Sequence, residues 1–302
     1  MPPRASFRPR LPRAAVLVLA LAAVCGCSRE PAPAPRDSSA PRHFSPSPSP
    51  PPATRVVSLA PNLTEIVFAV GAGERLVGVS DFSDFPPEAK SIPSVGGVEM
   101  SAERIVSLRP DLVLANGDGG TVRGAASSVQ AAGIPVLAVP TTSLDQVLAA
   151  IHSIGERLGR AEQASRLADE LARRREAVRR SAASRRKPRA ILLVWPEAPQ
   201  AAGGGTFLND VLTEAGAVNL LGDRPGWPVV SEEWLATAPI EVIVIPDSPR
   251  NRPVYDRAFA SGSLSRGSAA RARVLRLDES VLTRPGPRVF DALESLARDL
   301  PR

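Results

Sequence analysis

Arg55-Val56-Val57-Ser58-Leu59-Ala60-Pro61, followed by Asn62-Leu63-Thr64-Glu65, is the stretch that decides the fold class of this chain. Its first half is a β-branched run that ends in a proline turn, and this pattern predicts a strand. Its second half places Asn62 three residues before Glu65 and ahead of the apolar run Ile66–Val70, which predicts an N-cap and a helix. A strand followed at once by a helix is the repeating unit of parallel α/β sheets.

The same alternation continues through residues 55–142 and predicts an N-terminal α/β lobe. Further strands are expected at Leu76–Ser80, Pro110–Ala115 and Pro135–Val139, with helices that begin at Ser101 and span Thr121–Ala132. A loop, Asp81–Pro87, separates the second strand from the helix at Ser101.

The order of strand, helix, strand, helix and strand across residues 55–115 resembles the cobalamin and ferric-siderophore class of substrate-binding proteins that feed ABC importers, and within it the BtuF-like branch. The resemblance covers about residues 55–300. It implies an α/β fold of two lobes, with mostly parallel sheets covered by helices, joined by a long backbone α-helix (class III). It also implies that the ligand lies between the lobes and that no chemistry is performed on it.

Residues 143–187 have the helical periodicity expected of that backbone. Apolar residues recur at three- and four-residue steps from Leu144 to Leu158, and Gly159 is placed to bend the segment. A second α/β set in residues 188–302 predicts a C-terminal lobe. Its strands are expected at Ala190–Trp195, Ile240–Ile245 and Arg273–Leu277, and its helices at Leu208–Ala215, Ser231–Ala236, Val254–Ala260 and Gly286–Leu300, with Pro287 in the first turn of the last helix.

The first 26 residues read as a lipoprotein signal peptide. Four arginines precede the uncharged apolar run Ala14–Val24, which is too short to span a bilayer as a mature helix. The run ends in Val24-Cys25-Gly26-Cys27, which is similar to a bacterial lipobox and predicts lipidation at Cys27. An ordinary secretory peptide is the alternative, and Cys25 is the less favoured acylation site. Residues 27–54 then read as the lipidated cysteine and a Pro/Ser-rich tether.

Composition excludes several classes of function. The formal net charge is +6, but the four signal-peptide arginines supply four of those charges, so nucleic acid is not an expected partner. Cys25 and Cys27 are the only cysteines, and His43 and His152 the only histidines, which argues against a disulfide framework and against a zinc or manganese receptor. The sequence contains no H-E-x-x-H, G-x-S-x-G or Walker pattern, so an enzyme is not expected.

The scarce aromatic residues are the candidate ligand contacts. Phe82, Trp195 and Trp227 fall on loops or strand ends, where large flat side chains suit a flat, mostly apolar ligand. In the resembled class, these loops face the cleft between the lobes; the alternative is that each residue only packs its own lobe. Arg284, in a rigid Pro-Gly-Pro loop, is a candidate contact for carboxylate, amide or phosphate acceptors, with a solvated surface arginine as the alternative.

Glu103 and Glu233 occupy matching positions, each two residues after a serine expected to cap a helix. Their ordinary role is to support a helix start. In the resembled class, one acidic residue of each lobe pairs with arginines of the membrane transporter, so both are predicted transporter-docking residues.

These expectations combine into one function. The chain is predicted to be an exported, membrane-anchored, monomeric lipoprotein that captures cobalamin or a related corrinoid and delivers it to an ABC permease and its ATPase. No cofactor is expected. A stacking tryptophan of the resembled branch is absent near Val95–Met100, where this chain has Gly96 and Gly97, and a ferric siderophore or haem is the alternative ligand. A non-transport structural lipoprotein and an enzyme are the more distant alternatives.

Overall fold

A computed structural model describes residues 50–117 and 123–301. The signal peptide, Cys27 and most of the expected tether lie outside these residues. Residues 49–302 form one compact unit, and the two lobes described below are parts of it. Among the described helices, none is long and apolar enough to cross a membrane.

The N-terminal lobe is built on a parallel sheet with the strand order β2-β1-β3-β4. Its strands are β1 (Val56–Ser58), β2 (Leu76–Val79), β3 (Leu112–Asn116) and β4 (Val136–Val139). Its helices are α1 (Pro61–Ala69), α2 (Ala102–Ser107) and α3 (Arg123–Ala131), with two short 3-10 turns at Gly73–Arg75 and Pro87–Ser91. Each predicted strand is confirmed to within two residues at either end.

The start of α1 corrects the sequence prediction. The helix begins at Pro61 rather than at Ile66, its N-cap is Ala60, and no side chain caps it. Proline is favoured in the first helical turn because its missing N–H is not needed there and its φ is already helical. Asn62 is therefore a helical residue and not an N-cap, and Glu65 is free of the capping role expected for it.

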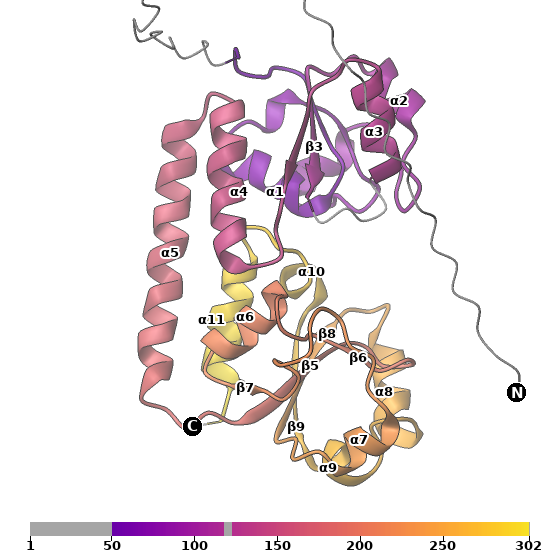
Figure 1. The fold of residues 1–302 in the computed structure, drawn as a ribbon, viewed down its shortest axis with the longest axis vertical. Helices are drawn as coiled ribbons and strands as arrows, with labels where there is room; N and C mark the ends of the chain where they lie inside the picture. The colour runs from indigo at the N-terminus through magenta and orange to yellow at the C-terminus, as the bar shows by residue number, and fades with distance from the viewer. Residues whose placement is uncertain (1–49, 118–122, 302) are drawn as a thin grey trace, which may run out of the picture. The chain divides into compact units, whose positions relative to one another are not determined.

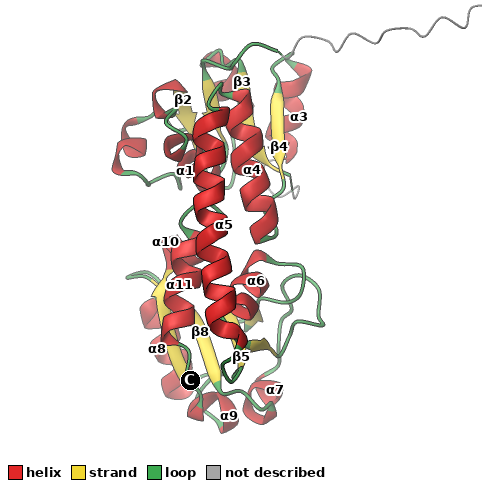
Figure 2. Ribbon diagram, turned by 90° about the vertical axis from the view of Figure 1, so that its left-hand side faces the viewer, coloured by secondary structure: helices red, strands yellow, loops and turns green. Residues whose placement is uncertain are grey.

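Two antiparallel helices join the lobes, α4 (Leu144–Arg157) and α5 (Ala161–Ala183). Gly159, with φ +60°, lies in the break between them, and a Cβ there would lie 2.9 Å from Pro52 Cγ. Figure 1 shows the two helices side by side, and Figure 2 shows α5 running past helices of both lobes. The long backbone helix implied by the resemblance is thus α5, while α4 returns along the N-terminal lobe and packs on α1.

The C-terminal lobe is built on a five-stranded sheet in which only β6 is antiparallel to its neighbour. The strands are β5 (Arg189–Trp195), β6 (Gln200–Ala201), β7 (Val218–Asn219), β8 (Val242–Asp247) and β9 (Arg273–Asp278). The helices are α6 (Phe207–Glu214), α7 (Glu232–Thr237), α8 (Arg252–Ser261), α9 (Gly267–Arg271), α10 (Glu279–Leu282) and α11 (Val289–Asp299). Sequence reasoning missed β6, β7, α9 and α10, and it began the last helix too early, because Pro287 precedes α11.

Both faces of each sheet are buried, which is the arrangement of parallel sheets covered by helices. Successive residues of β1 face opposite sides of the sheet and belong to different hydrophobic clusters. Val56 packs under α1 and α4, while Val57 packs with Ile105 of α2. The C-terminal sheet repeats the pattern, with Leu192 in the same central core as Val56 and Ile191 in a separate cluster on the opposite face. One core therefore continues through both lobes along the linking helices.

Hydrogen bonds hold residues 53–55, near the start of the described chain, against the N-terminal lobe. Asp111 accepts hydrogen bonds from the backbone N–H and hydroxyl of Thr54 and from the backbone N–H of Arg55, at 2.7–3.1 Å. These bonds, opposed by partial burial, hold the pKa of Asp111 below its usual value. The backbone N–H of Ala53 donates to Arg157 O (2.9 Å), and Ala53 O accepts from Arg75 (2.8 Å).

Candidate functional site

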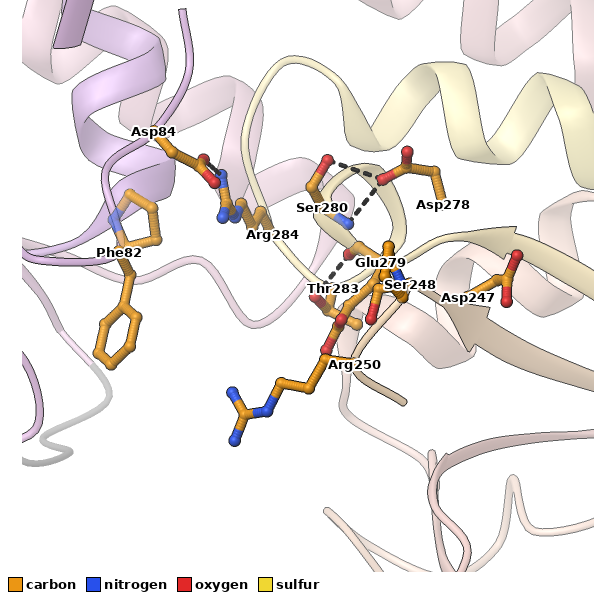
Figure 3. A pocket seen from close by; sticks show the side chains of 12 residues that line it. Phe82, Asp84, Asp247, Ser248, Arg250, Asp278, Glu279, Ser280, Thr283 and Arg284 are labelled. Carbon is orange, nitrogen blue, oxygen red and sulfur yellow. Dashed lines mark hydrogen bonds and ion pairs between the residues drawn. The ribbon is translucent and has the colours of Figure 1, made fainter. Parts of the chain in front are cut away.

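A cavity of about 540 Å³ lies where the carboxyl ends of the two sheets face one another. The N-terminal lobe lines it with Pro61, Phe82 and Asp84. The C-terminal lobe lines it with the residues that follow β8 and β9, namely Asp247, Ser248, Pro249, Arg250, Asp278, Glu279, Ser280, Thr283 and Arg284. Figure 3 shows Phe82 and Arg250 reaching into this space from opposite walls. The structure therefore brings two of the predicted ligand contacts, Phe82 and Arg284, into one pocket.

Buried hydroxyls fix the loop that carries Phe82. Ser83 Oγ lies 2.9 Å from Ser80 Oγ and 3.0 Å from Thr64 Oγ1. Thr64 Oγ1 also donates to Ser58 Oγ at 2.9 Å, which ties the loop to β1 and α1. All four hydroxyl residues are at most 5% exposed, whereas Phe82 is 49% exposed. The loop is thus pinned from beneath, and its aromatic ring is left available on the pocket side.

Arg250 is the cationic side chain of the pocket without a partner among the residues that the structure describes. Its neighbour Ser248 is fixed by a reciprocal pair of hydrogen bonds with Asn251, at 2.9 and 3.3 Å. Asp247, at the end of β8, is held by Arg252, and this hydrogen bond keeps the pKa of the Asp247 carboxyl below its usual value. The guanidinium of Arg250, by contrast, forms no hydrogen bond or ion pair with another described residue and extends into the pocket.

Arg284 lines the same pocket but is already paired. It donates to Asp84 at 2.5 Å and lies 3.6 Å from Glu65, both carboxylates of the N-terminal lobe. The hydrogen bond from Arg284, opposed by partial burial, holds the pKa of Asp84 below its usual value. Burial acts to lower the pKa of Arg284, but its bonds to the carboxylates outweigh that effect and raise it. Both groups therefore stay charged at neutral pH.

Arg288 completes this cross-lobe group. It binds Glu65 in a bidentate manner, at 3.0 and 2.6 Å, and Glu65 is 2% exposed on its side chain. We call Glu65 and Asp84 with Arg284 and Arg288 the clasp. The guanidinium of Arg288 also lies 3.9 Å from the centre of the Phe85 ring. Phe85 is 40% exposed, with its ring packed against this arginine.

Trp195 and Trp227, the two other predicted aromatic contacts, do not line this cavity. Trp195 ends β5, which runs parallel to β8, so it lies at the edge of the sheet that faces the pocket. Gln200 pairs with Trp195 and donates to Trp227 O at 3.3 Å. The Trp227 ring meets Phe207 edge-on, with centroids 6.4 Å apart. We call Trp195, Phe207 and Trp227 the aromatic edge; both tryptophans are 42% exposed.

Glu103 and Glu233 lie in the first turns of α2 and α7, two exposed six-residue helices. The expected serine caps are confirmed: Ser101 accepts from the backbone N–H of Arg104 at 3.2 Å, and Ser231 accepts from that of Trp234 at 3.1 Å. Neither glutamate lines the pocket. Their matched placement in the two lobes is that expected from the sequence, and their docking role stays a prediction.

Sequence reasoning missed four charged residues on which this site depends: Glu65, Asp84, Arg250 and Arg288. Glu65 was interpreted as part of a helix cap, although it falls between Leu63 and Ile66 on the apolar face of α1. A carboxylate within an apolar stripe is a signal that it is paired with a cation. Asp84 and Arg250 carry no comparable local signal, because their role depends on the meeting of two lobes.

Comparison with known proteins decides the family. The model of a family described as periplasmic binding protein matches residues 56–279. The chain belongs to the periplasmic binding protein family. An uncharacterised ABC transporter substrate-binding lipoprotein, YvrC of Bacillus subtilis, is 29% identical over 252 residues, which are 82% of this chain and 79% of that protein. This periplasmic binding protein is accordingly a substrate-binding protein of the ABC-importer class.

Two solved structures of binding proteins share its fold equally well. The haem-binding RhuT of Roseiflexus sp. RS-1, in apo form, has a TM-score of 0.73 at 30% identity and covers 82% of this chain and 97% of its own. The vitamin B12-binding BtuF of Vibrio cholerae has a TM-score of 0.72 at 27% identity and covers 82% and 96%. Proteins with different ligands thus match with nearly the same score, so the ligand must be argued from the site and not from the fold.

Proposed function

We propose that this binding protein carries cobalamin or a related corrinoid in the cleft between its lobes. The observation that supports this most is the makeup of the pocket. It combines an exposed aromatic ring, Phe82, with charged and hydroxyl side chains. Trp195 of the aromatic edge ends β5, the parallel neighbour of β8, and the last residue of β8, Asp247, lines the pocket. A large, flat, mostly apolar ligand that bears amides and a phosphate matches those groups.

Haem is disfavoured because the pocket offers its iron no axial ligand. Protein ligands to haem iron are His, Cys, Met or Tyr. Residues 50–302 contain only three such residues: His152, Met100 and Tyr255. None of them lines the pocket, and Tyr255 is fully buried and donates to Leu193 O at 2.9 Å. Cobalamin needs no such residue, since it brings its own axial base to cobalt.

A ferric siderophore is the second candidate, and Arg250 is the observation that favours it. A siderophore saturates the coordination of its iron, so the absence of a protein ligand is no obstacle. An anionic iron chelate would gain from an unpaired guanidinium that extends into the cleft. A corrinoid and a ferric siderophore differ in charge and in aromatic stacking, so binding experiments can distinguish the two candidate ligands.

Calorimetry on residues 49–302 tests the proposal directly. The titrants are cobalamin, cobinamide, a ferric hydroxamate, a ferric catecholate and haem. Cobalamin should bind with a Kd in or below the micromolar range, with a negative heat-capacity change from burial of apolar surface. Saturable binding of a ferric siderophore without binding of cobalamin would replace the first ligand by the second. No binding by any titrant would favour a structural role instead.

Transport partners and the membrane anchor complete the proposal. The loaded protein would dock on an ABC permease through Glu103 and Glu233 and act as a monomer in the space outside the cytoplasm. Cys27 would carry the lipid that keeps it at the membrane. Replacing Cys27 with serine should release the protein into the soluble fraction on cell fractionation. Membrane retention of an acylated Cys27→Ser variant would contradict this assignment.

A further inference from the structure

The clasp joins the two lobes through a carboxylate that solvent barely reaches. Glu65 belongs to α1 of the N-terminal lobe, and its two nearest cations, Arg284 and Arg288, belong to the loop between α10 and α11 of the C-terminal lobe. The Glu65 side chain is 2% exposed, and each of the two arginine side chains is 17% exposed. Together with Asp84, the group holds two carboxylates and two guanidinium groups, so its charges balance within the protein.

Close backbone packing accompanies these charges. Asn62, one turn before Glu65, donates to Pro285 O at 3.3 Å. Gly286 lies so close to α1 that a Cβ on it would be 3.3 Å from Asn62 O. The loop that carries both arginines therefore packs closely on the start of α1, and a side chain larger than glycine at position 286 would require a small shift of one against the other.

The position of the clasp relates it to the ligand cleft. Arg284 and Asp84, its two outer members, line the pocket, whereas Glu65 and Arg288 lie behind them. A bidentate arginine–carboxylate pair is directional as well as strong, so it fixes the orientation of the groups that it joins. Any change in the separation of the lobes at this wall would have to break the pair or expose Glu65.

We propose that Glu65 is a positioning residue of the cleft, which holds the two lobes at one separation beside the pocket before any ligand arrives. Glu65 and Asp84 then hold Arg284 against the wall of the pocket, and Arg250 is the guanidinium that remains available to bind a ligand. The ligand part of this inference rests on the proposed function; the part that concerns lobe separation does not.

The separation of the lobes can be measured without a ligand. Residues 28–302 contain no cysteine, so Gln130→Cys on α3 and Arg271→Cys on α9 give residues 49–302 one spin label in each lobe. Double electron–electron resonance between the two spin labels should give one narrow distance distribution in the labelled protein without further changes. Glu65→Gln, Arg288→Gln and the double variant are then compared with it, after circular dichroism has established that each is folded.

The distribution should broaden in Glu65→Gln, in Arg288→Gln and in the double variant. The double variant should be no broader than the wider single variant, because both changes remove the same pair. Glu294→Gln is the matched control: it breaks the bidentate pair of Glu294 with Arg174 on α5, at 2.7 and 2.8 Å, without touching the clasp. That control should leave the distribution unchanged.

Glu65→Gln alone leaves the largely buried Arg288 without its carboxylate and could fail to fold, whereas the double variant removes a charge of each sign and keeps the site neutral. The parental distribution in the folded double variant would overturn the proposal. Ligand affinity is measured afterwards on the same variants, with whichever titrant binds the parent, and should fall about tenfold as the lobes lose their fixed separation. A broadened distance distribution in the variants, with no titrant bound by the parent, would reject the proposed ligand and support the role of the clasp. Binding of cobalamin, with an unchanged distance distribution in the variants, would support the proposed ligand and reject the role of the clasp.

Discussion

The aromatic edge of the C-terminal lobe and the clasp between the two lobes differ in their exposure to solvent. Trp195 and Trp227 leave 42% of their surface open, while Glu65 leaves 2% of its side chain open. The aromatic edge has spare apolar surface that a ligand could cover. The clasp has its partners already and gains nothing from a ligand. We therefore expect the aromatic edge to act on affinity through direct contact with a ligand, and the clasp to act on affinity only through the separation of the lobes.

Removing Trp227 should have the largest effect on ligand affinity. A buried aromatic contact at a binding surface is worth about 2 kcal/mol or more on truncation, so Trp227→Ala should weaken binding at least about tenfold. Phe82→Ala, on the opposite lobe, should act in the same direction. Calorimetry with the ligand of the parent protein measures both, and the melting temperature should stay within a few degrees, because each ring is about half exposed.

Val218→Ala is the control for that experiment, since Val218 is 45% exposed on β7 and lies away from the pocket. Parental affinity in both Trp227→Ala and Phe82→Ala would show that the ligand binds elsewhere and would leave the aromatic edge without a function.

Arg250→Ala should have a smaller effect, which depends on the charge of the ligand. An exposed ion pair contributes at most about 1 kcal/mol, so binding of cobalamin or an anionic chelate should weaken about two- to fivefold. The loss should shrink as salt is raised. Cobinamide, which lacks the phosphate of the nucleotide loop, should bind equally well to Arg250→Ala and to the parent.

Arg271→Ala, on the exposed surface of α9, is the matched control and should change neither affinity nor salt dependence. An equal loss for cobalamin and cobinamide in Arg250→Ala would assign Arg250 a contact other than the phosphate.

Changing Glu103 and Glu233 together should have no effect on ligand affinity, because neither residue belongs to the aromatic edge, the clasp or the pocket. The double change to alanine should instead impair uptake and complex formation with the transporter, since rim charges act on encounter and register. Reversal of both to lysine should impair uptake further by adding repulsion against arginines of the transporter. Normal uptake in the lysine variant would reduce both residues to helix-capping carboxylates.

Local patterns predicted the elements of this fold well because local physics decides them. β-branched runs became strands, and Ser101 and Ser231 cap their helices as their positions suggested. The start of α1 was wrong by one turn because Pro61 provides the helix start that Asn62 was expected to provide. Strands of two residues, such as β6 and β7, were not predicted because two residues are too few to show an alternating pattern.

The site was harder to predict because its contacts join distant parts of the sequence. Glu65 and Arg288 are separated by 223 residues, and no pattern near either one indicates the other. Scarcity and position made the aromatic residues candidates from the sequence; Phe82, Trp195 and Trp227 are exposed, and their contact with a ligand stays a prediction. Their division between a pocket wall and a neighbouring edge depends on the strand order β6-β5-β8-β9, which the sequence does not reveal.

The fastening of Ala53 and Thr54 has a mechanical consequence. A pull on the chain that precedes Ala53 is carried first by Asp111, by Arg75 and by the turn between α4 and α5. None of these residues lines the pocket. The force would therefore pass into the linking helices α4 and α5 and not into the walls of the pocket. If residues 27–54 form the predicted tether, a pull on it would not act directly on the residues that line the pocket.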